Sequence, residues 1–173
     1  MFYFILFITI AIETGLGASP QFTDGAIAAN DQLVANSVTP DGKTQDGWQP
    51  EPQEPTGKYT TATEVKPILS MTKAHWAAVR EYEGKDLLYL SNLLAWRCGL
   101  HEIRYSINQG PAKIWEMEKC HLNTGQPNAL TMETVMPYKT FDPGFVNSLT
   151  LMLVYDDAST ENATFKRSDI LMP

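Results

Sequence analysis

The chain has few cysteines and fewer basic than acidic residues. Two cysteines leave room for a single disulfide and no more. Thirteen Lys and Arg against 20 Asp and Glu give a formal charge of -7, so the chain has no general attraction for phosphate backbones and nucleic acid is not an expected partner. A length of 173 residues allows one ordinary core, which excludes a large multidomain enzyme.

Long hydrophobic runs are also scarce, since the only one is MFYFILFITIAI at residues 1–12. This run is too short to cross a bilayer as a stable helix, and small and polar residues follow it at once. It therefore predicts a signal peptide over residues 1–18, and no stable membrane span once that segment is removed. No Lys or Arg precedes the run, so a buried helix or strand of the domain remains an alternative.

Residues 19–57 contain few large apolar side chains and carry most of the net negative charge. Such a segment buries too little apolar surface to offset its chain entropy, which predicts a disordered acidic linker. Trp48 is isolated within it. This residue either docks in a partner's groove or is an ordinary linker residue.

From residue 58 to residue 173, short apolar and aromatic runs alternate with Gly, Asn and Asp, which is typical of strands and hairpins. The first expected hairpin joins 75–82 to 86–96 through a turn at 83–85. Within the second run, SNLLAW fits a strand or a helical turn equally well.

A second hairpin is expected around Gln109, where alternating residues 103–107 meet the turn Asn108-Gln109-Gly110. We expect Gly110 to supply the left-handed residue of this turn. If antiparallel partners are centred on Gln109, Cys98 lies opposite Cys120. The register thus predicts a disulfide between these two cysteines in an oxidising compartment, contributing about 3 kcal/mol.

A third hairpin is expected at the C-terminal end, with a core face formed by Leu149, Leu151, Leu153 and Phe165. Residues 121–144 read as a long surface connection, a common place for binding. No long amphipathic helix stands out. The pattern predicts an all-β fold, either a small antiparallel sandwich or an open barrel built from hairpins.

The segment HEIRYSINQG at 101–110 resembles strand-and-turn segments of bacterial immunoglobulin-like sandwich domains. The resemblance covers about ten residues. It implies a general sandwich layout and transfers no functional residue, because such sandwiches have many unrelated roles.

Two thiols and two imidazoles, at Cys98, His101, Cys120 and His121, raise the possibility of a zinc site. Neighbouring residues on a strand point to opposite faces, so Cys120 and His121 do not suit one ion. The disulfide is the preferred interpretation, and we predict neither a metal nor a cofactor.

Common catalytic motifs are missing, including G-x-S-x-G and Gly-rich phosphate loops. Among possible acid–base pairs, Glu116 and Glu118 are interpreted as solvent-side strand residues, and Asp156-Asp157 as turn residues.

Aromatic residues concentrate between residues 76 and 115, more densely than a small core needs. We therefore name Trp76, Arg104, Tyr105 and Trp115 as candidate binding residues for a sugar or a peptide. The alternative is that the aromatic side chains fill the core.

Together these features predict a periplasmic or secreted protein with a noncatalytic binding or assembly role at the cell envelope. Its expected partner is an envelope protein, a peptide or a glycan. The alternative is a small extracytoplasmic hydrolase that uses His101 or His121 with carboxylates from the long loop.

Overall fold

The computed structural model describes residues 47–173. The predicted signal peptide and residues 19–46 of the predicted linker lie outside the described residues. Residues 47–56 contain no helix or strand, and several of them contact the domain, among them Trp48, Glu51, Gln53 and Thr56. The backbone N–H of Glu51 donates to the carbonyl oxygen of Asp156 at 2.8 Å, and the Gln53 side chain donates to the Asp156 carboxylate at 2.9 Å. Within residues 47–173, no helix is long and apolar enough to cross a membrane.

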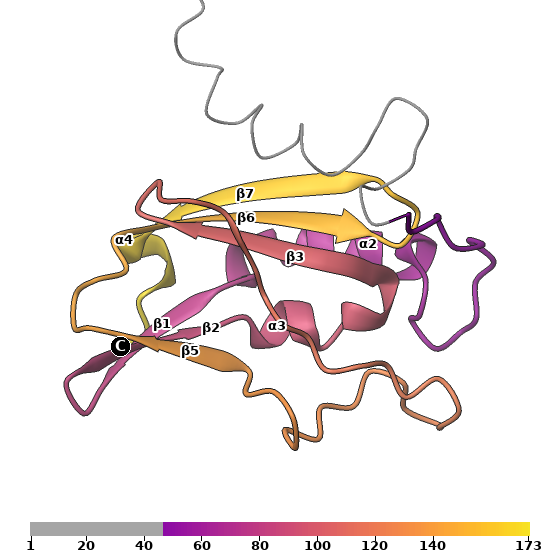
Figure 1. Ribbon diagram of the computed structural model, residues 1–173, viewed down its shortest axis with the longest axis horizontal. Helices are drawn as coiled ribbons and strands as arrows, with labels where there is room; N and C mark the ends of the chain where they lie inside the picture. The colour runs from indigo at the N-terminus through magenta and orange to yellow at the C-terminus, as the bar shows by residue number, and fades with distance from the viewer. Residues whose placement is uncertain (1–46) are drawn as a thin grey trace, which may run out of the picture.

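Two antiparallel sheets form the architecture (Figure 1). One has three strands in the order β1-β2-β5, formed by Ala78–Tyr82, Lys85–Tyr89 and Tyr138–Phe141. The other has four strands in the order β4-β3-β6-β7, formed by Lys113–Ile114, Leu100–Ile107, Ser148–Tyr155 and Thr160–Lys166. The predicted mostly β, antiparallel fold is confirmed.

One hydrophobic core joins the two sheets. Val79 and Leu88 of the first sheet belong to the same buried cluster as Leu149, Leu151 and Leu153 of the second. Phe165 of β7, at 8% exposure, completes the predicted core face. Each large apolar side chain buried in this way stabilises the fold by about 1.5–3 kcal/mol.

The first hairpin turns where the sequence predicts. Tyr82 pairs with Lys85, and the two residues between them, Glu83 and Gly84, have φ of 49° and 70°. Positive φ at both central positions matches the twist of the flanking strands. The first strand is shorter than expected, because Lys73–His75 form a 3-10 helix (η1) and β1 begins only at Ala78.

The register predicted for the second hairpin is confirmed. Arg104 pairs with Ile114, and Tyr105 with Lys113, so both pairs are centred on residue 109. The expectation for Gly110 is wrong, since Asn108 and Gln109 take the left-handed conformation, with φ of 52° and 60°.

The Asn108 side chain explains this conformation. Its Oδ1 accepts hydrogen bonds from the backbone N–H groups of Asn147 and Ser148, each at 3.0 Å. Asn tolerates positive φ better than most residues, and these bonds hold it there. The turn is thereby tied to the start of β6.

Five helical elements, η1 included, accompany the strands within residues 47–173, and the longest, helix α2 at Ala62–Met71, was not expected. Its buried residues are Ala62, Val65 and Leu69, and Pro67 interrupts the sequence pattern. The helix begins where Glu64 accepts hydrogen bonds from the N–H groups of Thr60 and Thr61. Burial opposes ionisation of Glu64, yet hydrogen bonds, led by Thr60, lower its pKa to about 2.

The shorter helical elements are α3 at Ser91–Leu94, the 3-10 helix η2 at Arg97–Gly99 and α4 at Arg167–Ile170. Helix α3 resolves SNLLAW as a helical turn. The interpretation of 121–144 as loop throughout is wrong, because Tyr138–Phe141 forms β5 and pairs with β2.

Candidate functional site

The predicted disulfide is present. Cys98 and Cys120 are bonded, with Cα atoms 5.6 Å apart. Cys98 belongs to η2 rather than to a strand, so the bridge links the residues before β3 to the segment that follows β4. Each cysteine is consumed by this bond, and neither thiol is available as a metal ligand or nucleophile.

Arg97, next to this bridge, is buried at 1% exposure. Its guanidinium donates to five backbone carbonyl oxygens, at 2.7–3.3 Å, from residues 94, 118, 119, 128 and 129. Burial lowers the pKa of Arg97, and the charge of Glu118 opposes that shift. This side chain therefore holds together the loop between β4 and β5.

Glu118 is buried at 8% exposure, which corrects its interpretation as a solvent-side strand residue. The ladder of β4 ends at Ile114, so the strand alternation does not extend to residue 118. Its carboxylate accepts hydrogen bonds from Thr131, Met132 and His121 Nε2, the last at 2.8 Å. These bonds, led by the Thr131 hydroxyl, lower the pKa of Glu118 to about 2 against the effect of burial.

His121 also borders a shallow cleft of about 460 Å³. The cleft is lined by His121, Thr124, Gly125, Gln126, Ala129 and Thr131. A histidine and a carboxylate thus lie within hydrogen-bond distance beside a concave surface, as the hydrolase alternative requires.

His101 lies elsewhere, stacked on Trp48 with ring centroids 3.8 Å apart. The aromatic residue of the predicted linker thus contacts the domain of its own chain. Within residues 47–173, no group of three or more His, Cys, Asp or Glu side chains is arranged to hold a metal ion.

The structure brings only two of the four candidate binding residues together. Tyr105 and Trp115 pack edge to face with ring centroids 5.3 Å apart, and both are buried. Arg104 pairs with Glu102, and the Arg104 side chain points to the opposite face of β3 from Tyr105. Trp76 is completely buried in a different part of the core. The burial of the three aromatic residues matches the core-packing alternative, and a binding role for these four residues stays a prediction.

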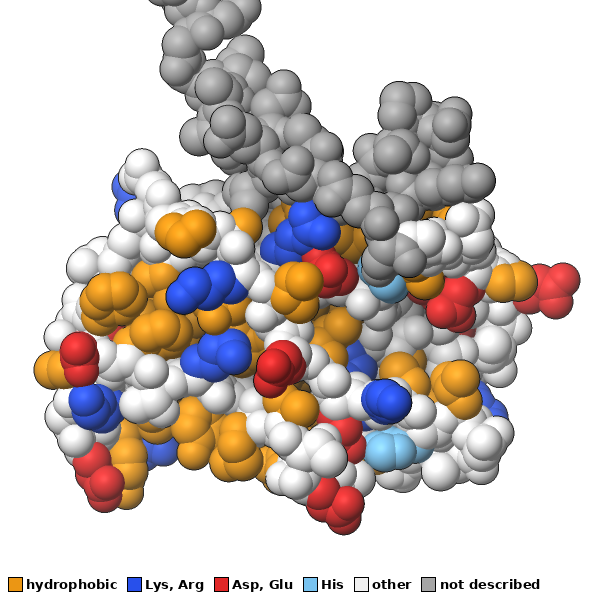
Figure 2. All heavy atoms as spheres, viewed as in Figure 1, with side chains coloured by type: hydrophobic (Ala, Val, Ile, Leu, Met, Phe, Trp, Pro, Cys, Tyr) orange, Lys and Arg blue, Asp and Glu red, His pale blue; other side chains and the backbone are white. Residues whose placement is uncertain are grey.

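Lys139 of β5 covers the Tyr105–Trp115 pair. Its Nζ lies 5.9 Å from the Tyr105 ring and 5.1 Å from the Trp115 ring. Figure 2 shows basic and hydrophobic side chains interspersed on the face of the molecule that it presents. The cation occupies the ring faces that a stacking ligand would need, so this pair is a poor platform.

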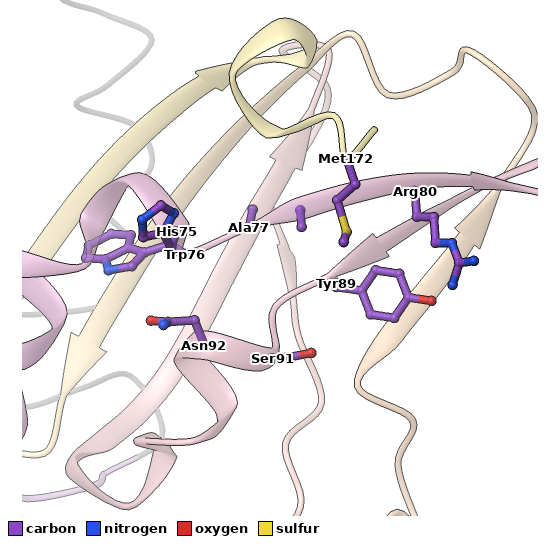
Figure 3. A pocket seen from close by; sticks show the side chains of 9 residues that line it. His75, Trp76, Ala77, Arg80, Tyr89, Ser91, Asn92 and Met172 are labelled. Atoms are coloured by element: carbon purple, nitrogen blue, oxygen red, sulfur yellow. The ribbon is translucent and has the colours of Figure 1, made fainter.

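A pocket of about 400 Å³ lies beside Trp76 (Figure 3). It is lined by His75, Trp76, Ala77, Ala78, Arg80, Tyr89, Ser91, Asn92 and Met172. These residues come from η1, the two-residue segment that joins it to β1, β1 itself, β2, α3 and the C-terminal tail. In Figure 3, Arg80 and Tyr89 lie at one end, His75, Trp76 and Asn92 at the other, and Met172 between them.

Several pocket residues are held by hydrogen bonds to their neighbours. Trp76 Nε1 donates to the carbonyl oxygen of Leu69 at 2.9 Å, which fixes the indole. Asn92 Oδ1 accepts a hydrogen bond from the hydroxyl of Thr72 at 3.2 Å. The backbone N–H of Met172 donates to the carbonyl oxygen of Val79 at 2.8 Å, which holds the C-terminal tail against β1.

Arg80 differs from the other three arginines of the chain. The others bind carboxylates or backbone carbonyls inside the protein: Arg97 through the loop carbonyls, Arg104 through Glu102, and Arg167 through Asp86 and Glu81. Arg80 is exposed and contacts the Tyr82 ring at 5.0 Å, but it forms no ion pair with any residue in 47–173. No acidic side chain lines the pocket.

The sequence identifies part of this pocket. Trp76, Arg80 and Tyr89 belong to the aromatic and basic cluster visible in the chain, but Ser91, Asn92 and Met172 carry no such signal. Met172 reaches the pocket only because Leu171 bridges Val79 in parallel. A tail packed on a distant strand has no local sequence pattern to reveal it.

Comparison with known proteins adds no further guide, since no family model, no curated protein and no solved structure matches this chain.

Proposed function

We propose that the protein is an exported, noncatalytic binding or assembly protein of the cell envelope. The apolar leader at residues 1–12 supports export. The Cys98–Cys120 bond supports an oxidising destination, such as the periplasm or the extracellular space.

The pocket beside Trp76 is the observation that carries the binding role. It combines a fixed apolar wall with a few polar groups at its rim, the usual composition of a small-ligand site. A carboxylate that could pair with His75 for acid–base chemistry is missing from its lining. These features favour binding over turnover at this place.

Recovery of the full-length gene product from exporting cells tests the export part of the proposal. The sample is alkylated before and after reduction, and its intact mass is measured. Cleavage after residue 18 and alkylation of both thiols only after reduction are expected, because the disulfide forms outside the cytoplasm. An uncut leader together with two thiols that react without reductant would contradict export.

A hydrolase remains the second candidate, favoured by the 2.8 Å contact between His121 and Glu118. Within residues 47–173, however, no hydroxyl or thiol hydrogen-bonds to the other ring nitrogen of His121, so no nucleophile is in position. Turnover of p-nitrophenyl acetate that saturates, and that is lost in His121→Gln, would establish this candidate. The binding proposal expects the same slow hydrolysis by wild type and variant.

A further inference from the structure

We propose that the pocket beside Trp76 binds an organic carboxylate with an aromatic or branched apolar body. The carboxylate pairs with Arg80, and the apolar body packs on Ala78, Tyr89 and Met172, the accessible apolar side chains of the lining. This inference rests on the proposed binding function and names the ligand chemistry for that site.

The apolar wall is rigid before any ligand arrives. Trp76 and Ala77 have 0% and 5% exposure, and the indole is fixed by its bond to Leu69. Lys73 Nζ also lies 5.2 Å from the Trp76 ring, so Trp76 and Ala77 close the back of the pocket. The accessible apolar surface belongs to Ala78, Tyr89 and Met172. A preformed back wall costs little ordering on binding, and the Tyr89 ring and the Met172 side chain suit a flat or branched apolar group.

Strand register explains why the guanidinium of Arg80 lies at one end of the pocket together with Tyr89. Ala78 pairs with Tyr89, and residues 78 and 80 lie on the same face of β1, so Arg80 is a diagonal neighbour of Tyr89 on that face. Figure 3 shows both side chains at the same end of the pocket. A guanidinium and a phenolic hydroxyl are both hydrogen-bond donors that a carboxylate accepts.

The sign of the ligand charge follows from what surrounds Arg80. The pocket lining contains no Asp or Glu, and Arg80 lacks an ion pair within residues 47–173. The other three arginines are neutralised or enclosed by the protein itself. An amine would meet an uncompensated positive charge here, whereas a carboxylate supplies the missing partner.

Three small ligands of similar shape test the charge directly. The full-length protein, isotope-labelled and with its disulfide intact, is titrated by NMR with 3-phenylpropanoate, 3-phenylpropan-1-ol and 3-phenylpropylamine. The carboxylate is expected to shift the Trp76 indole N–H and the Ala77 and Ala78 amides. The alcohol is expected to bind about 10-fold more weakly and the amine more weakly still, since one charge-assisted bond is lost or becomes repulsive.

Variants locate the effect. Arg80→Gln is expected to weaken binding of the carboxylate about 10-fold and to leave binding of the alcohol unchanged. Arg80→Lys is expected to keep the preference for the carboxylate. Lys113→Gln removes an exposed cation outside the pocket and is expected to change the affinity for neither the carboxylate nor the alcohol. An NMR spectrum that is unchanged away from the substituted residue shows that each variant is folded.

A peptide pair separates two sources of the carboxylate. A short peptide ending in Phe is compared with the same peptide as its C-terminal amide. Binding of the free acid peptide as strongly as 3-phenylpropanoate assigns the site to peptide ends; binding of 3-phenylpropanoate alone assigns it to small acids. Both results support the carboxylate chemistry.

The two levels of the proposal fail in different ways. If the alcohol binds at Trp76 as strongly as the carboxylate, or Arg80→Gln binds both normally, the charge inference is overturned while the binding role survives. If none of the ligands shifts any pocket resonance, the inference is overturned and the binding role loses its support as well.

Discussion

The surroundings of Arg97 and of Arg80 differ in what the protein provides for the charge. Arg97 is enclosed, and five carbonyl oxygens of its own chain accept its hydrogen bonds. Arg80 lies at a pocket rim and is paired with no carboxylate among residues 47–173. A cation whose donors are all used by the chain stabilises the fold, whereas one with unused donors is available to a ligand.

Removing Arg97 is expected to have the largest effect. Arg97→Met leaves buried carbonyl oxygens without donors and is expected to lower the free energy of unfolding by about 3–5 kcal/mol. Urea unfolding followed by Trp fluorescence measures this. A loss below about 1 kcal/mol would mean that water replaces these bonds and that the loop is not held by Arg97.

Breaking the disulfide is expected to come next. The bond joins residues 22 positions apart, so replacing both cysteines with Ala is expected to cost about 3 kcal/mol through the entropy of the unfolded chain. The same urea measurement applies, with reductant added to the wild type as a second route to the open form. Equal stability with and without the bond would show that Arg97 alone holds this region.

Acid is expected to weaken the same region through Glu118. Because the folded-state pKa is about 2 and the ordinary value is 4.5, the stabilisation is present above about 4.5 and is lost as the pH falls from there towards 2. Glu118→Gln is expected to flatten the dependence of stability on pH in that window. The pKa of Glu64 is also lowered by folding, so a residual dependence of stability on pH is expected in this variant. An unchanged slope would mean that Glu118 is not hydrogen-bonded in solution.

Removing Arg80 is expected to have the smallest effect on stability. Arg80→Met is expected to change the free energy of unfolding by less than about 0.5 kcal/mol, since the side chain is exposed and has no ion pair with residues 47–173. Urea unfolding of Arg80→Met and Arg97→Met under the same conditions measures the difference between the two sites. A loss comparable to that of Arg97→Met would make Arg80 a structural residue.

Local pattern explains which parts of the fold are predictable. The turns at 83–84 and 108–109, the core face of β6 and the Cys98–Cys120 pairing all follow from short-range alternation and from register about a turn. Helix α2 could not be predicted in this way, because Pro67 interrupts its sequence pattern and tertiary packing supplies its stability.

Strand β5 and the pocket depend on long-range contacts. Tyr138–Phe141 is four residues long and becomes a strand by pairing with β2, about fifty residues earlier in the sequence. The pocket needs the C-terminal tail beside β1. The aromatic cluster was visible in the sequence, but which of its members reach a cavity depends on this assembly.

A crystal structure of the full-length protein with 3-phenylpropanoate tests the central claim most directly. The account predicts the phenyl ring in the Trp76 pocket against Tyr89 and Met172, and the carboxylate within hydrogen-bond distance of the Arg80 guanidinium. A carboxylate turned to solvent, or a ligand seated in the cleft beside His121 while the Trp76 pocket stays empty, would contradict it.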